Sequence, residues 1–96
     1  MMIREVAEKD PSNMYAQYML GVGGLMSGQL DRAIERLLLV SSNQPDNVEV
    51  KLMLAEAYER KGDKMNAVKW YESVRPYISS PEILLELEKR MQSLKK

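Results

Sequence analysis

The chain has 96 residues, of which 45% are hydrophobic, and its 14 basic residues balance its 14 acidic residues. This length and composition predict one small domain with a hydrophobic core, and the neutral charge argues against a nucleic-acid-binding module, which usually carries a basic surplus. The absence of cysteine and histidine excludes disulfides, thiolate metal sites and the most common general base.

The first ten residues, MMIREVAEKD, predict a short helix over residues 2–9. They carry several charges and no long apolar core, so they do not resemble a secretory signal. No apolar run in the sequence approaches the roughly 18 residues that span a bilayer. We therefore expect a cytoplasmic protein, or a fragment of one, that does not insert into a membrane.

Apolar residues at three- and four-residue spacing predict two helix pairs in the middle of the chain. Asn13 and Asn47 are suitable N-caps, and Gly28 and Gly62 stand where the first helix of each pair should end. The expected helices are, in chain order, 14–27, 30–42, 48–61 and 64–76.

A last helix is expected over residues 81–95, with Ser80 as its N-cap and Pro81 in its first turn. Its apolar stripe is narrow, and its basic residues are confined to its end. These features favour packing against the preceding helices over binding to a membrane or to a calmodulin-like partner. The stripe consists of Leu84, Leu87, Met91 and Leu94.

The sequence matches itself when it is shifted by 34 residues. Val6 falls on Val40 and Ile3 on Leu37, so the register extends back to the N-terminus. A period of 34 residues is typical of helix–turn–helix repeats. The identical pairs include Pro11 with Pro45, Asn13 with Asn47, Gly28 with Gly62, Ala33 with Ala67, and Val40 with Val74.

These residues resemble the tetratricopeptide repeat family. The motif positions in the second repeat are Leu54-Ala55, Tyr58, Gly62, Ala67, Tyr71 and Val74, and those in the first are Leu20-Gly21, Gly28, Ala33, Leu37, Val40 and Pro45. The first repeat departs from the family pattern at Gly24 and Leu37, where the family has aromatic residues.

The resemblance implies an all-α solenoid of antiparallel helix pairs in a single domain spanning residues 1–96. Its expected parts are a half-repeat helix at 2–9, repeat 1 at 14–47, repeat 2 at 48–80 and a capping helix at 81–95.

Four glycines lie in the stretch LGVGGLMSG, residues 20–28. A phosphate-binding loop would need a preceding strand and a following Lys-Ser or Lys-Thr, and neither is present. We expect Gly21 to permit close approach of the partner helix. The space left by Gly24 is either filled by a neighbour such as Tyr18 or Tyr58, or is a groove for a partner.

The resemblance also implies a concave face, lined by the first helix of each repeat, that binds a partner's peptide or helix. The alternative is that an earlier repeat or the helix at 2–9 covers the apolar part of this face. The second candidate function is a structural unit that forms homodimers through the exposed N-terminal helix. The candidate partner-binding residues are Tyr15, Tyr18, Val22, Leu25, Met26, Glu49, Leu52, Glu56, Glu59 and Arg60.

Tyr18 and Val22 stand where a chaperone-binding carboxylate clamp would have Lys and Asn, so this mechanism is rejected. The acidic pairs are explained by solvated helix faces and i,i+4 ion pairs, so we expect no enzymatic activity, no cofactor and no metal. Trp70 is expected to be buried under the final helix, with an exposed anchor as the alternative.

Overall fold

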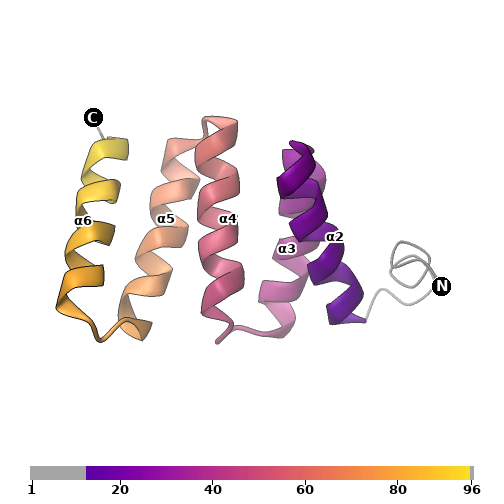
Figure 1. Ribbon diagram of the computed structural model, residues 1–96, viewed down its shortest axis with the longest axis horizontal. Helices are drawn as coiled ribbons and strands as arrows, with labels where there is room; N and C mark the ends of the chain where they lie inside the picture. Colours follow the sequence, from indigo (N-terminus) through magenta and orange to yellow (C-terminus); the bar gives the residue numbers. More distant parts are fainter. Residues whose placement is uncertain (1–12, 96) are drawn as a thin grey trace.

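The helices form a row in which each runs antiparallel to the next (Figure 1). The computed structural model describes residues 13–95, which form helices, turns and loops and contain no strand. Each helix packs chiefly against the helices adjacent in sequence. The expected all-α, helical-repeat architecture is therefore confirmed, whereas the helix expected at 2–9 lies outside the described residues. The elements are α2 (Met14–Ser27), α3 (Leu30–Asn43), α4 (Val48–Lys61), α5 (Lys64–Val74), the 3-10 helix η1 (Arg75–Tyr77) and α6 (Pro81–Lys95).

Two predicted boundaries differ from the structure: α3 continues one residue further, to Asn43, and α5 stops at Val74 instead of continuing to residue 76. Pro76 has no backbone N–H to donate to the preceding turn, so the chain tightens into η1. At the start of α6, the hydroxyl of Ser80 accepts a hydrogen bond from the N–H of Ile83 at 3.4 Å, as expected of an N-cap.

The 34-residue repeat recurs in the backbone at the start of the first helix of each pair. The side-chain oxygen of Asn13 accepts from the N–H of Ala16, and that of Asn47 accepts from Val50, each at 3.1 Å. Both asparagines have nearly the same φ and ψ. The N-caps therefore open α2 and α4 in the same way.

The ends of these two helices are also equivalent. Gly28 and Gly62 have φ values of +81° and +91°, a left-handed conformation that glycine adopts without steric cost. The N–H of Gln29 donates to the carbonyl of Gly24 at 2.8 Å, and that of Asp63 donates to Tyr58 at 2.9 Å. These bonds satisfy carbonyls that a helix terminus would otherwise leave unpaired.

Two clusters of buried side chains hold the row together. The first joins α2, α3 and α4, and consists of Leu25, Ala33, Ile34, Leu37, Val40, Val50, Leu54 and Ala57. The second joins α4, α5 and α6, and consists of Ala55, Ala67, Tyr71, Leu87 and Met91.

Trp70 is half-buried and packs against both clusters, so it is neither fully buried under the last helix nor an exposed anchor. The ammonium nitrogen of Lys51 lies 5.5 Å from the centroid of its ring, within the range of a cation–π interaction. The indole therefore links the two helix pairs.

Candidate functional site

Helices α2 and α4 are the first helices of their pairs. Together with α6, they form a surface that we call the first-helix face. Polar contacts join α2 to α4 on it. The hydroxyl of Tyr18 donates to the carboxylate of Glu49 at 3.1 Å, and Arg60 donates to the carbonyl of Leu25 at 3.0 Å. This face therefore has a fixed geometry across two consecutive helix pairs.

The predicted partner-binding residues divide into three groups on this face. Of the large apolar members, Tyr15 and Met26 are 68% and 83% exposed, and Leu52 is 39% exposed. Tyr18, Val22 and Glu59 are half-buried, and the other exposed members are Glu49, Glu56 and Arg60.

The remaining member, Leu25, is only 7% exposed and belongs to the first core cluster. Its assignment to a partner-binding surface is therefore wrong. Gln17, Gly21 and Leu25 are spaced by four residues, so they form one stripe on α2, and all three are buried. The tertiary contacts place that stripe inside the fold.

A hollow of about 330 Å³ lies where α2 meets the connection between α3 and α4. It brings together Tyr15, Tyr18 and Glu49, which the sequence predicted from two different repeats. Burial and the hydrogen bond to Glu49 raise the pKa of the Tyr18 hydroxyl, so it remains a protonated donor. The hollow also includes three residues that the sequence analysis did not assign to a binding surface, namely Met14, Gln44 and Asn47.

Glu59 and Arg90 connect α4 to α6 through two hydrogen bonds, at 2.6 and 2.9 Å. Tyr71 donates a third bond to the same carboxylate at 3.4 Å. The guanidinium of Arg90 is the main cause of the lowered pKa of Glu59. Glu59, predicted as a partner contact, is thus already engaged within the fold, with Arg90, which the sequence spacing had paired with Glu86 on its own helix.

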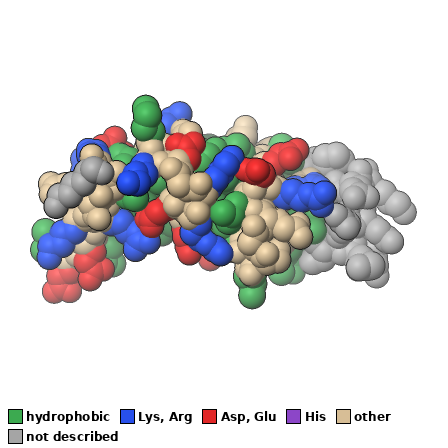
Figure 2. All heavy atoms as spheres, turned by 90° about the horizontal axis from the view of Figure 1, so that it is seen from above, with side chains coloured by type: hydrophobic (Ala, Val, Ile, Leu, Met, Phe, Trp, Pro, Cys, Tyr) green, Lys and Arg blue, Asp and Glu red, His purple; other side chains and the backbone are tan. Residues whose placement is uncertain are grey.

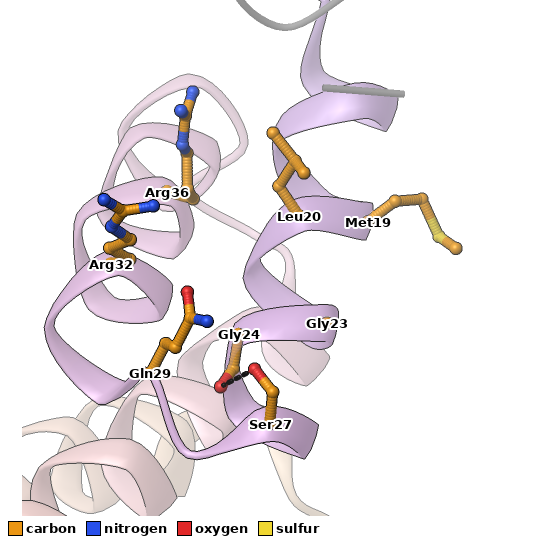
Figure 3. Close-up of a pocket in the computed structure, with 8 residues that line it drawn as sticks. All are labelled: Met19, Leu20, Gly23, Gly24, Ser27, Gln29, Arg32 and Arg36. Atoms are coloured by element: carbon orange, nitrogen blue, oxygen red, sulfur yellow. Dashed lines mark hydrogen bonds between the residues drawn. The ribbon is translucent and has the colours of Figure 1, made fainter. Parts of the chain in front are cut away.

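A second hollow, of about 200 Å³, lies between α2 and α3 (Figure 3). We call it the glycine groove. Met19 and Leu20 extend from α2, whereas Arg32 and Arg36 rise from α3 on the other side. Its lining residues are Met19, Leu20, Gly23, Gly24, Ser27, Gln29, Arg32 and Arg36.

The three glycines within α2 have three different environments. A β-carbon on Gly21 would lie 2.7 Å from two side-chain atoms of Leu37, so the expected close approach of the partner helix is confirmed. A β-carbon on Gly24 would lie 3.0 Å from that of Ala33 and 3.3 Å from its backbone. Among residues 13–95, no neighbour lies within 4 Å of the same atom on Gly23.

The space beside Gly24 is therefore filled, but by Ala33 of α3 and not by Tyr18 or Tyr58. A β-carbon points sideways from the helix axis, so adjacent glycines in α2 face different neighbours. Within the described part of the chain, the open space lies at Gly23, one residue away from the position that the sequence suggested.

Charges are mixed on the surface. Figure 2 shows acidic and basic side chains interspersed over the face that it displays. Among residues 13–95, no three acidic side chains gather in a way that could hold a metal ion. Within the same range, no helix has both the length and the apolar character needed to cross a membrane. The first-helix face carries exposed tyrosine and methionine side chains together with exposed carboxylates.

A scan against models of known protein families finds no match, and a search of curated proteins finds no relative.

Proposed function

We propose that this chain is a tetratricopeptide-like, non-enzymatic scaffold that binds a partner's peptide or helix on its first-helix face. The observation that carries the proposal is the exposure of Tyr15 and Met26 on the helix that also carries the half-buried Tyr18. Large apolar side chains beside a polar rim are typical of protein contact sites. The cytoplasmic location and the absence of nucleic-acid binding stay predictions.

The chemistry of the face indicates what kind of segment it would bind. The part on α2 offers tyrosine and methionine side chains, whereas the part on α4 offers Leu52 between the exposed carboxylates of Glu49 and Glu56. A partner segment that combines apolar anchors with a lysine or arginine would complement both parts. The hollow at Tyr15 is the expected place for the aromatic or aliphatic anchor.

A peptide-display selection on the full chain, followed by calorimetry of the selected peptide, tests this proposal. Met26→Ser and Tyr15→Ser should each weaken binding by roughly tenfold, because they remove exposed apolar contacts. Met65→Ser is the matched control, since Met65 is 86% exposed on α5, which is not part of the first-helix face. Equal weakening by the control, or selected peptides insensitive to all three changes, would contradict the assignment of this face.

The second candidate function, homodimerisation at the N-terminal side, is favoured by the partial exposure of Met19 beside the glycine groove. Light scattering on the chromatographed full chain separates the two functions. A dimer that persists at micromolar concentration and dissociates on Met19→Ser would favour assembly. A monomer would leave the scaffold function as the better proposal.

A further inference from the structure

Another hollow, of about 360 Å³, lies where the start of α5 meets the end of α6. Its floor is apolar, because Val68 and Leu94 are half-buried and pack against the second core cluster. Met65, which also lines it, is 86% exposed. We call it the α5–α6 hollow, and its lining residues are Lys64, Met65, Val68, Leu94 and Lys95.

The same junction exists one repeat earlier, where the start of α3 meets the end of α4. A shift of 34 residues carries Asp31 onto Met65 and Lys61 onto Lys95. The ammonium nitrogen of Lys61 lies 2.5 Å from the carboxylate of Asp31. At the first junction, therefore, the lysine at the end of α4 binds a carboxylate supplied by α3.

The second junction keeps the lysine but not this carboxylate. Met65 stands in place of the aspartate, and the ion pair that Lys95 forms with Glu72 is long, at 3.8 Å. Leu94 stands in place of the charged Arg60. The second junction thus combines an apolar floor with a lysine whose equivalent binds a carboxylate closely.

A second lysine borders the hollow. Lys64 stands in place of Leu30, which is half-buried against the first core cluster. Lys64 is exposed, and no carboxylate of residues 13–95 forms an ion pair with it. An apolar floor between two cations is complementary to a segment that carries both an apolar side chain and carboxylates.

We propose that the α5–α6 hollow is a second binding site, for a segment of a partner protein in which an apolar side chain is flanked by aspartate or glutamate. The apolar side chain contacts the floor and Met65, whose flexible thioether adapts to side chains of different shape. The carboxylate binds Lys95 as Asp31 binds Lys61.

This site differs from the first-helix face in place and in charge. The hollow lies at the far end of the row from α2, which carries Tyr15 and Met26 (Figure 1). The exposed carboxylates of the first-helix face favour a basic segment, whereas the lysines of the hollow favour an acidic one. The inference therefore does not depend on the proposed function of the first-helix face.

A selection from a random peptide-display library tests the proposal. The bait is the full chain with Tyr15→Ser and Met26→Ser, which weaken the first-helix face. The selected peptides should carry an apolar residue close to aspartate or glutamate, and calorimetry should show equal affinity for the bait and for the wild type. A selection that yields no peptide, or yields basic ones, would overturn the proposal.

Met65→Asp is the sharpest variant, because it restores beside Lys95 the carboxylate that the first junction has. It should weaken binding of the selected peptide by at least about tenfold. Met65→Leu keeps an apolar side chain and should change the affinity by less than about twofold. Because Met65 is 86% exposed, the fold should tolerate both changes. Equal binding to the two variants would contradict the site.

Lys95→Gln tests the contact with the carboxylate. It should weaken binding by about fivefold at low salt and should reduce the dependence of the affinity on salt concentration. Lys69→Gln is the matched control, because Lys69 is an exposed lysine of α5 that does not line the hollow. An equal loss in both variants would mean that general attraction to basic residues causes the binding, and it would overturn the proposal.

A second copy of the chain is the competing occupant, since Ile83 and Leu85 are 54% and 56% exposed and lie in sequence between Glu82 and Glu86. Light scattering on the bait variant distinguishes the two occupants, and a monomer is expected. An oligomer that dissociates on Met65→Asp would assign the hollow to a second copy and would overturn the proposal.

Discussion

The two helix pairs have the same backbone frame but different side chains at equivalent positions of their two helices. In the first pair, Arg36 donates to the side-chain oxygen of Gln17 at 2.9 Å. At the equivalent positions of the second pair, Lys51 lies over the ring of Trp70. The second pair therefore packs an indole against the first core cluster, whereas the first pair has a guanidinium that borders the glycine groove.

A further difference lies at the equivalent positions Leu25 and Glu59. Leu25 is buried in the first core cluster, whereas Glu59 binds Arg90 of α6. The helix that follows each pair thus decides whether this position is apolar or charged. The helix caps and turns depend on local contacts within each pair. The type of side chain at the contacts between pairs depends instead on the neighbouring helix.

The largest effect is expected from overpacking at the small residues Ala33 and Ala67, both completely buried. Each substitution by leucine should destabilise the fold by roughly 1–3 kcal/mol. Ala33→Leu should lie at the upper end, because its neighbour at Gly24 is helix backbone that cannot rotate away. Urea unfolding measures both variants. A neutral result at either position would contradict the assigned equivalence of the two pairs.

The adjacent glycines Gly23 and Gly24 should respond to alanine with opposite signs. Gly24→Ala should destabilise by about 1 kcal/mol, because the crowding against the backbone of Ala33 outweighs the gain in helix propensity. Gly23→Ala should stabilise by about 0.5–1 kcal/mol, because its β-carbon meets none of the described residues and the equivalent position, Ala57, carries a β-carbon in a fully buried place. Urea unfolding of the two single variants measures both changes in stability, and each variant serves as the control for the other. Stabilisation by Gly24→Ala would mean that α2 and α3 are less closely packed than described.

Substitution of the two N-cap residues tests the backbone geometry that both helix pairs share. Asn13→Ala and Asn47→Ala should each cost about 1 kcal/mol, because each removes an acceptor for a backbone N–H at a helix start. Asn47 also donates to the side chain of Gln44 at 2.9 Å, so its substitution should be the more costly of the two. Thermal melts followed by circular dichroism would measure the difference. Serine at either position should restore most of the loss, since it also caps.

The smallest effect is expected from the ion pair between Glu59 and Arg90, which is exposed on the arginine side. Because Arg90 lowers the pKa of Glu59 in the folded state, the carboxylate adds stability above its unfolded pKa of about 4.3. This contribution is lost as the pH falls through the lower, folded pKa. Glu59→Gln should therefore destabilise by at most about 1 kcal/mol at pH 7 and by almost nothing in strong acid.

Urea melts of the wild type and of Glu59→Gln across that pH range measure this dependence. Glu56→Gln is the matched control, because Glu56 is an exposed carboxylate on the same helix. A penalty for Glu59→Gln that persists unchanged in acid would show that the ion pair is not its source.

The sequence by itself determined where helices begin and end in the described part of the chain. Asn13, Asn47, Gly28 and Gly62 form bonds with residues only a few positions away, so their pattern predicts the backbone directly. The 34-residue period also predicted which helices form pairs. Pro76 gave an equally local signal for the early end of α5, which the sequence analysis overlooked.

Only the tertiary structure decided which helix faces are covered. Helical periodicity puts Gln17, Gly21 and Leu25 on one stripe, but it does not say whether that stripe faces the core or a partner. The exposure of Tyr15, the burial of Leu25 and the different surroundings of Gly23 and Gly24 depend on the position and crossing of α3 and α4. Those contacts join residues on different helices, and local spacing carries no information about the gap between two helix surfaces.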